Sequence, residues 1–264
     1  MKLYIVTDLE GCSGVVRESQ LHGGAPAVVR ANRILAAETN AAVGAACAAG
    51  ADEILVAHGH TSPDELEFDL YDERPKYVLG VDIAGTLDGS FAAVGFVGQH
   101  ALSSSGGVLE HTYDMRNYHR ITLNGRMVGE IGFIAAVAGD CGVPVAFLSG
   151  DEAACREVEE LCPGVATAAV KRGLSRNAAV TLHPKAAAEL IASAVADGLA
   201  RAGDITPFSV AGPVEMVVEY NSCAPVERNT LIPGVEAAGP RAAKFTGQTA
   251  TDCYRMFALM GRIV

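Results

Sequence analysis

The chain has 264 residues, of which 50% are hydrophobic and 19% are charged. This composition excludes a disordered, collagen-like or coiled-coil protein, and the length suits one large globular domain or two small ones. The 31 acidic residues outnumber the 20 basic ones, so the formal net charge is −11. Because nucleic acid and anionic membranes both bind cationic surfaces, we expect neither as a partner.

The N-terminus and the cysteines indicate the compartment. Asp8 and Glu10 interrupt the apolar run that a secretory signal peptide would need, and no stretch approaches the roughly 18–20 apolar residues that span a bilayer. The seven cysteines are widely spaced and none forms a C-x-x-C pair, so neither a zinc ribbon nor a redox pair is predicted. We therefore expect a cytoplasmic protein whose reduced cysteines pack as small hydrophobic residues.

A strand, a helix and a second strand are predicted at the start of the chain. Residues 2–7 form a short apolar, β-rich run, residues 27–49 follow an alanine-rich helical pattern, and residues 53–57 form a second apolar run. A strand–helix–strand unit of this size places its two strands in parallel, so it predicts a parallel sheet.

The central part of the chain continues this alternation. Strands are predicted over residues 77–81, 92–97 and 121–123, a helix over 127–138, and a buried strand over 144–148. Strands and helices therefore continue to alternate along this part of the chain.

The next segment has clear helix boundaries. Asp151 is predicted to cap a helix that runs to residue 161, where a Pro-Gly pair follows. A strand is predicted over 165–170 and a helix over 184–202, which begins favourably with Pro184 in its first turn.

The pattern changes after residue 205, where an alternating strand over 214–220, a loop-rich stretch and a helix near 252–260 are predicted. We therefore expect a three-layer α/β/α fold with a largely parallel, mixed sheet and a smaller C-terminal α+β portion. Residues 1–205 would form the core that carries the site, and residues 206–264 would pack on it, unless both belong to one domain.

Acidic residues follow the first predicted strand. If that strand continues through Glu10, the side chains of Asp8 and Glu10 point to the same face, because strand side chains alternate. Two buried acids repel each other unless a cation or protons neutralise them. The alternative is an acidic turn in which Asp8 caps the local backbone.

Histidines cluster in the middle of the sequence, where five of the seven lie between residues 58 and 119. His58 and His60 end the second predicted strand, at the sheet edge where open α/β folds bind their ligands. Imidazole and carboxylate groups are zinc ligands, but loop histidines also hydrogen bond to backbone without any metal.

Three further residues are candidates for the same chemistry. His100 closes an apolar strand, Glu110 and His111 share a loop, and Glu130 lies in the first turn of a predicted helix. Each also has a purely structural interpretation, and an acid at the position of Glu130 complements the helix dipole.

Several common catalytic motifs are absent from the sequence. It contains no G-x-G-x-x-G, G-x-S-x-G, H-E-x-x-H or Walker loop. A dinucleotide-binding Rossmann protein, a serine hydrolase and a zincin therefore have no motif support.

The order of several segments resembles one known family along nearly the whole chain. The matching segments are residues 7–11 (TDLEG), His60, 98–101 (GQHA), 107–111 (GVLEH), 124–130 (NGRMVGE), 168–176 (AAVKRGLSR) and 231–234 (LIPG). On these segments the chain resembles the M55 metallopeptidases, the family of the zinc-dependent D-aminopeptidase of a dipeptide-transport operon.

The resemblance implies a two-zinc aminopeptidase that acts on short peptides or amino-acid amides, with D-amino-acid-containing substrates favoured. The implied ligands of the two zinc ions per subunit are Asp8, Glu10, His60, His100 and Glu130. The resemblance also implies that His111 is the catalytic residue and that the protein forms a large homo-oligomer, a decamer. We expect Asp8 to bridge the ions, because it follows the most buried strand.

Two positions depart from the family pattern. Val6 stands where the family tends to have serine, and His58 stands where an aspartate is expected. An aspartate there would orient His60 through its second ring nitrogen, so His58 is either a substitution in that supporting role or an additional ligand.

Two alternatives to the aminopeptidase stay open at this point. One is another dinuclear metallohydrolase, which would act on a different amide or on a phosphoester. The other is a non-catalytic zinc- or dipeptide-binding protein associated with transport.

Overall fold

The computed structural model describes residues 1–23, 26–60, 66–80 and 83–262, which form two β-sheets. The strands of sheet A are β1 (Lys2–Thr7), β2 (Glu53–His58), β3 (Lys76–Val78), β4 (Ala93–Gln99), β7 (Val145–Asp151), β8 (Ala166–Ser175) and β9 (Ala178–Thr181). Their order across the sheet is β3-β2-β1-β4-β7-β8-β9. All neighbouring pairs are parallel except β8 and β9, which confirms the largely parallel, mixed sheet.

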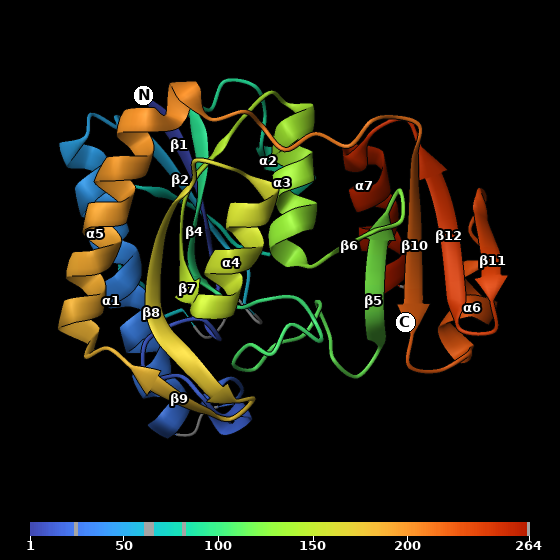
Figure 1. Cartoon of the computed structure of the whole chain (residues 1–264), viewed down its shortest axis with the longest axis horizontal. Coiled ribbons are helices and arrows are strands. Elements are labelled where there is room, and N and C mark those ends of the chain that lie inside the picture. Colours follow the sequence, from blue (N-terminus) through green and yellow to red (C-terminus); the bar gives the residue numbers. More distant parts are fainter. Residues whose placement is uncertain (24–25, 61–65, 81–82, 263–264) are drawn as a thin grey trace.

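Helices cover both faces of sheet A (Figure 1). Helices α1 (Pro26–Ala48) and α5 (Pro184–Arg201) pack together on one face, while α3 (Glu130–Asp140) and α4 (Glu152–Leu161) lie on the other. Strands β1, β4 and β7 are therefore buried on both faces, which explains their continuous apolar runs. Among the described helices, none is long and apolar enough to cross a membrane.

Sheet B is antiparallel and lies on the far side of α3 (Figure 1). Its strands are β5 (Tyr118–Leu123), β6 (Arg126–Val128), β10 (Val214–Tyr220), β11 (Val235–Gly239) and β12 (Ala242–Gly247), in the order β11-β12-β10-β5-β6. The sheet combines β5 and β6 from before residue 205 with strands from after it. The division into domains at residue 205 stays a prediction.

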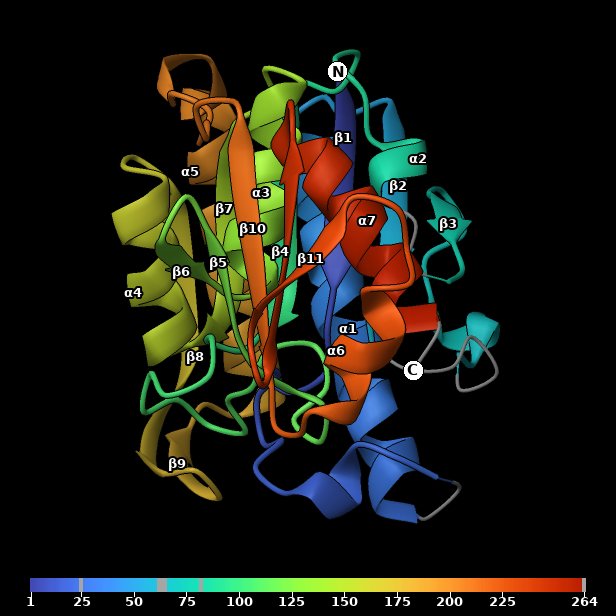
Figure 2. The same ribbon diagram turned by 90° about the vertical axis from the view of Figure 1, so that its right-hand side faces the viewer.

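Three shorter or later helices complete the fold: α2 (Ile83–Thr86), α6 (Ala224–Asn229) and α7 (Ala250–Arg262). Helix α7 packs against α3 and against β10 and β12, so α3 and α7 together fill the space between the two sheets. Figure 2 shows α7 and sheet B in front, with α3 and sheet A behind them.

Most long elements agree with the sequence-based predictions to within a few residues. Asp151 is confirmed as a helix cap, since its Oδ1 accepts a hydrogen bond from the Ala154 amide at 2.9 Å. The helix predicted from residue 127 instead begins at Glu130, because residues 126–128 pair with β5 after the tight turn at Asn124 and Gly125. The predicted strand over 77–81 ends at residue 78, and residue 81 lies outside the described residues.

Several short elements have no counterpart in the predictions: β6, β9, α6, β11 and β12. Each is at most six residues long, so each offers few positions from which a pattern can be read.

The strand order places one edge of sheet A at a topological switch point. After β1 the chain adds β2 on one side and then β4 on the other, so the carboxyl ends of β1, β2 and β4 lie side by side. Open α/β sheets bind their ligands in the crevice at such a point.

Candidate metal centre

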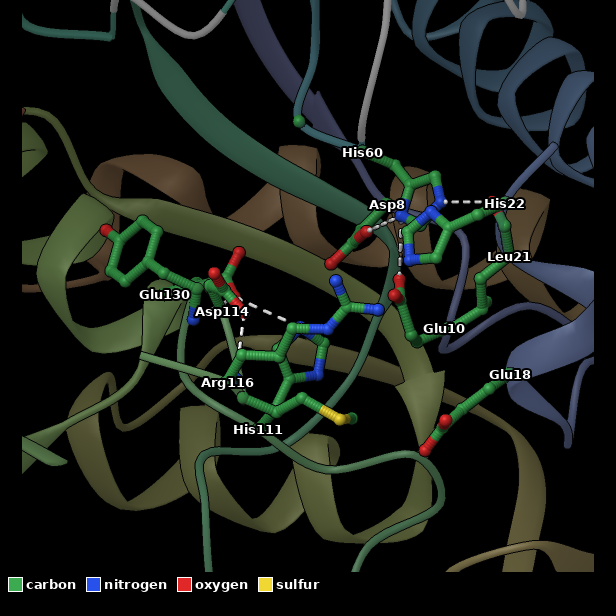
Figure 3. Close-up of a pocket in the computed structure, with 13 residues that line it drawn as sticks. Asp8, Glu10, Glu18, Leu21, His22, His60, His111, Asp114, Arg116 and Glu130 are labelled. Carbon is green, nitrogen blue, oxygen red and sulfur yellow. Dashed lines mark hydrogen bonds and ion pairs between the residues drawn. The ribbon is translucent and has the colours of Figure 1, made fainter. Parts of the chain in front are cut away.

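The acidic and histidine side chains predicted as zinc ligands meet in this crevice, and Figure 3 shows Asp8, Glu10, His60 and Glu130 there. They come from the segment after β1, the ends of β2 and β4, and the first residue of α3; the residues are Asp8, Glu10, His60, His100 and Glu130. The first four are at most 5% exposed. Carboxylates at this depth need a counter-charge, because burial penalises their ionised form.

Two glycines allow the segment after β1 to approach the end of β4. The Gly11 amide donates to the Gly98 carbonyl at 2.7 Å, and a Cβ on Gly11 would lie 2.0 Å from the Gln99 carbonyl oxygen. A Cβ on Gly98, whose φ is +73°, would lie 2.1 Å from the Asp8 carbonyl oxygen. Side chains at either position would force the Asp8 and His100 segments apart.

Each of the two ligand histidines has one ring nitrogen fixed by a backbone carbonyl. Nε2 of His60 lies 3.0 Å from the Leu21 carbonyl oxygen, and Nδ1 of His100 lies 2.9 Å from the Ala101 carbonyl oxygen. A carbonyl only accepts, so these nitrogens carry the protons and the opposite nitrogens are free to bind a metal. This arrangement is typical of metal-ligating histidines.

The free nitrogens point toward the carboxylates. Nδ1 of His60 lies 3.3 Å from Asp8 Oδ1 and 3.1 Å from Glu10 Oε2. Nε2 of His100 lies 3.4 Å from Asp8 Oδ2 and 3.3 Å from Glu130 Oε1. Ring nitrogens and carboxylate oxygens therefore lie close together, and both are ligand atoms that zinc binds.

The pKa values of the cluster show that its buried carboxylates favour a positive charge nearby. Burial, reinforced by the neighbouring charge of Glu10, raises the pKa of Asp8 to about 7. Burial would lower the pKa of His60, but the charge of Glu10 and the hydrogen bonds that Asp8 and Glu10 accept from the ring outweigh it and raise that pKa to about 11. A proton on His60 therefore balances carboxylates that a metal cation would otherwise neutralise.

The donor set fits zinc. Two overlapping groups each bring their ligand atoms within 4.8 Å of one another, the first formed by Asp8, Glu10 and His100 and the second by His100, His111 and Glu130. Glu10 Oε2 and His100 Nε2 are buried and have no hydrogen-bond partner of good geometry. Buried polar atoms without a partner are rare, and ligation of a cation would satisfy both.

His111 lies directly beside the predicted ligands. Its ring stacks on that of His100 with centroids 4.1 Å apart, and its Nδ1 donates to the Leu109 carbonyl at 2.9 Å. Nε2 is left free, 4.0 Å from Glu130 Oε1. Burial and the neighbouring charge of His100 lower the pKa of His111, so its imidazole is neutral near pH 7 and able to accept a proton at Nε2.

The backbone around His111 is strained. Leu109 and Tyr113, two residues on either side, have φ angles of +56° and +57°, in the left-handed region that non-glycine residues seldom adopt. Such strain persists only where surrounding contacts impose it, and it is common at functional sites.

His58 does not join the cluster. Its Nδ1 lies 3.4 Å from the Thr7 hydroxyl, and the side chain lines a second cavity of about 220 Å³ with Val6. Burial and the charge of His60 lower the pKa of His58 to about 4, so the ring is neutral. The Leu21 carbonyl takes the supporting role for His60 that we expected of an acid at position 58.

A cavity of about 480 Å³ opens beside the metal cluster and brings in residues that the sequence did not single out. These additional lining residues include Glu18, His22, Tyr113, Asp114, Met115 and Arg116. His22 stacks on His60 with centroids 5.5 Å apart. Residues 113–116 follow His111 directly in the chain, whereas Glu18 and His22 reach the cavity from the loop after β1, and no motif in the sequence marks either group.

Glu110, which shares a loop with His111, has a structural role. Its Oε2 accepts hydrogen bonds from the Ser105 hydroxyl at 2.7 Å and the Gly106 amide at 2.6 Å. The side chain therefore closes its own loop and is not among the residues that line the cavity.

The chain is similar to proteins of known activity along its whole length. A model of the M55 peptidase family, described as D-aminopeptidase, matches residues 1–259. The D-aminopeptidase of Bacillus subtilis (strain 168) is 30% identical over 267 residues, which cover 98% of this chain and 96% of that protein. The solved structure of the Zn-dependent D-aminopeptidase DppA from Bacillus subtilis, a self-compartmentalizing protease, is similar with a TM-score of 0.94 at 29% identity, covering 100% of this chain and 97% of that one.

Proposed function

Because the chain belongs to the M55 peptidase family of D-aminopeptidases, we propose that it is a zinc-dependent aminopeptidase that removes the N-terminal residue from short peptides or amino-acid amides. The observation that carries this proposal is the buried cluster in which His60 and His100 present free nitrogens to the carboxylates of Asp8, Glu10 and Glu130. A preference for D-amino-acid-containing substrates is part of the proposal, since the similar proteins are D-aminopeptidases.

We propose that the cluster holds two zinc ions. Asp8, Glu10 and His60 lie on one side of it and His100 and Glu130 on the other, with Asp8 in contact distance of both histidines. Asp8 would therefore contribute its carboxylate to both ions, and this role stays a prediction. Zinc bound there lowers the pKa of water and polarises the scissile carbonyl.

His111 is proposed to move the proton during hydrolysis. Its neutral Nε2 accepts the proton of the water that attacks the carbonyl carbon, and the imidazolium then gives that proton to the nitrogen of the leaving amine. The Leu109 carbonyl holds the ring in this orientation through Nδ1, and stacking on His100 keeps it against the metal ligands. The C–N bond breaks, and the products are a free amino acid and a shortened peptide or ammonia.

We also propose that the protein forms a large homo-oligomer, a decamer, in which the sites face an enclosed chamber. Support comes from the similarity to a self-compartmentalizing protease along the whole chain. Light scattering of the purified protein tests this part, and a monomer at micromolar concentration would contradict it. A cytoplasmic location and an association with dipeptide transport stay predictions.

The test of the activity combines metal analysis with turnover. Two zinc ions per subunit are expected, together with hydrolysis of D-alanyl peptides that exceeds hydrolysis of the matched L-alanyl peptides and is lost with a chelator. A panel of phosphoesters is included, because their cleavage in place of peptides would favour another dinuclear metallohydrolase. Zinc binding without turnover of any substrate would favour a binding protein.

A further inference from the structure

The cavity beside the metal cluster contains a basic side chain that has no partner among the described residues. Of the described residues that line this cavity, Arg116 is the only lysine or arginine. Its side chain is exposed and extends inward among the lining residues (Figure 3). Within the described part of the chain it forms no side-chain hydrogen bond, and no carboxylate lies within 4.0 Å of its guanidinium.

This absence of a partner is unusual, because the cavity is rich in acids. Five carboxylates also line it: Asp8, Glu10, Glu18, Asp114 and Glu130. Glu18 pairs instead with Arg176 at 3.7 Å, and Asp114 accepts hydrogen bonds from the Arg116 amide and the Asn117 side chain. The other three acids face His60 and His100. Arg116 is thus left available for an anion that enters the cavity from outside.

The backbone that carries Arg116 is held from two sides. Asp114 Oδ1 accepts a hydrogen bond from the Arg116 amide at 2.8 Å. Nδ2 of Asn221, which follows strand β10, donates to the carbonyls of Met115 at 2.9 Å and Arg116 at 3.2 Å. Only the side chain remains to be ordered when an anion binds, which lowers the entropic cost of binding.

We propose that Arg116 binds the C-terminal carboxylate of a short peptide whose N-terminal residue lies at the metal cluster. This inference rests on the proposed aminopeptidase function and specifies its substrate class. A short peptide has two charged ends. In an aminopeptidase the amine end and the scissile carbonyl lie at the cluster, so the carboxylate end lies away from it, where Arg116 supplies a positive charge. The planar guanidinium of arginine matches a carboxylate in two parallel hydrogen bonds, which a lysine does not reproduce.

The position of Arg116 also selects for peptide length. The metal cluster and Arg116 line the same cavity of about 480 Å³, so a substrate that touches both must end within it. Peptides of two or three residues with a free carboxylate meet this condition, whereas amino-acid amides lack the charge that Arg116 recognises. The preferred substrates are therefore very short free peptides, and amides are cleaved less efficiently.

The test measures hydrolysis of D-alanyl-D-alanine and of its C-terminal amide by the zinc-loaded full chain. Wild-type protein is expected to show a kcat/KM about 10- to 100-fold higher for the free peptide, chiefly through a lower KM, as for a hydrogen-bonded ion pair. In Arg116→Gln this ratio should fall to near one, and Arg116→Lys should restore only part of it. Arg120→Gln serves as the matched control, since Arg120 pairs with Glu219 at 2.6 Å and does not line the cavity.

Two results would overturn the role of Arg116. One is a wild-type enzyme that cleaves the peptide and its amide equally well; the other is an Arg116→Gln variant that slows both substrates by the same factor, which would indicate a structural role. A second arm measures calorimetric binding of D-alanyl-D-alanine to zinc-loaded His111→Ala protein with and without Arg116→Gln. Binding that weakens about tenfold or more in the double variant supports the inference even if wild-type turnover is absent, and that absence alone would refute the proposed function.

Discussion

The side-chain ammonium of Lys171 donates a hydrogen bond to the backbone carbonyl of Glu10, although the two residues are 161 positions apart. The same Nζ donates to the carbonyls of Cys12 at 2.9 Å and Val15 at 2.6 Å. Lys171 lies on β8 and is 3% exposed. Its three hydrogen bonds tie the backbone of the segment after β1 to β8. The carboxylate of Glu10 is thereby held at the metal cluster by a strand that contributes no ligand.

Replacing Lys171 with methionine is expected to loosen this segment. Three buried carbonyls would lose their donor, so the free energy of unfolding should fall by about 3 kcal/mol or more. Zinc content should fall as well, because Glu10 is no longer positioned. Urea unfolding and metal analysis measure both effects. Arg172→Met, at the exposed neighbouring position, is the control, and equal behaviour of the two variants would contradict a positioning role.

Replacing His111 with alanine is expected to abolish turnover and to leave bound zinc near the wild-type amount. Loss of the proton acceptor should lower kcat by about 10²–10⁴-fold. His119→Ala, on the exposed face of β5, should keep full activity. If zinc is lost together with activity, His111 is a ligand and not the residue that moves the proton.

The lowered pKa of His111 determines how activity depends on pH in the wild-type protein. Burial disfavours the imidazolium, so the ring is neutral and active above a pKa that lies below its usual value. As pH is lowered, kcat/KM is expected to stay constant across neutral pH and to fall only when the pH reaches that lowered pKa. An acid limb at or above the ordinary pKa of histidine would contradict this assignment.

Replacing Gly98 with alanine is expected to lower the free energy of unfolding far more than the same change at Gly50, a glycine that also has a positive φ. Both Gly98, with φ +73°, and Gly50, with φ +93°, impose a left-handed conformation that costs alanine roughly 1–2 kcal/mol. Only at Gly98 would the new Cβ also meet the Asp8 carbonyl, at 2.1 Å, whereas nothing lies within 4 Å at Gly50. Overpacking should add about 1–3 kcal/mol of destabilisation and reduce zinc binding in Gly98→Ala alone.

Glu157 provides a test of stability against pH. Its Oε2 accepts a hydrogen bond from the Leu102 amide at 2.8 Å, while its Oε1 is buried without a partner. Burial raises the pKa of Glu157 from 4.5 to about 7 in the folded protein. Between these values the folded state binds more protons than the unfolded state, so this residue makes the protein less stable as pH rises.

Replacing Glu157 with glutamine removes this penalty and keeps an acceptor for Leu102. The variant should gain stability relative to wild type by about 2–3 kcal/mol between pH 4.5 and pH 8, at about 1.4 kcal/mol per pKa unit. Urea unfolding of metal-free protein at both pH values measures the gain, with exposed Glu159→Gln as control. A difference between variant and wild type that is the same at both pH values would refute the raised pKa.

The sequence by itself determined the parallel sheet and the chemistry of its edge. The apolar runs of β1, β4 and β7 are long and uninterrupted, since these strands are buried on both faces, and such runs are recognisable without a structure. The ends of two of these strands also reveal Asp8 and His100 as polar residues at a ligand-binding edge. Their assembly into one site was implied only by the resemblance to a family.

Only the tertiary structure decided which groups support and surround that cluster. The carbonyl of Leu21 that orients His60 and the ammonium of Lys171 that holds the Glu10 backbone come from segments 39 and 161 positions away, and the guanidinium of Arg116 has no ion-pair partner among the described residues. A backbone carbonyl is present at every residue and an exposed arginine is common, so neither produces a pattern in the sequence. The roles of Leu21 and Lys171 arise because folding brings them into contact with His60 and Glu10, and that of Arg116 arises because its side chain lines the same cavity as the predicted ligands.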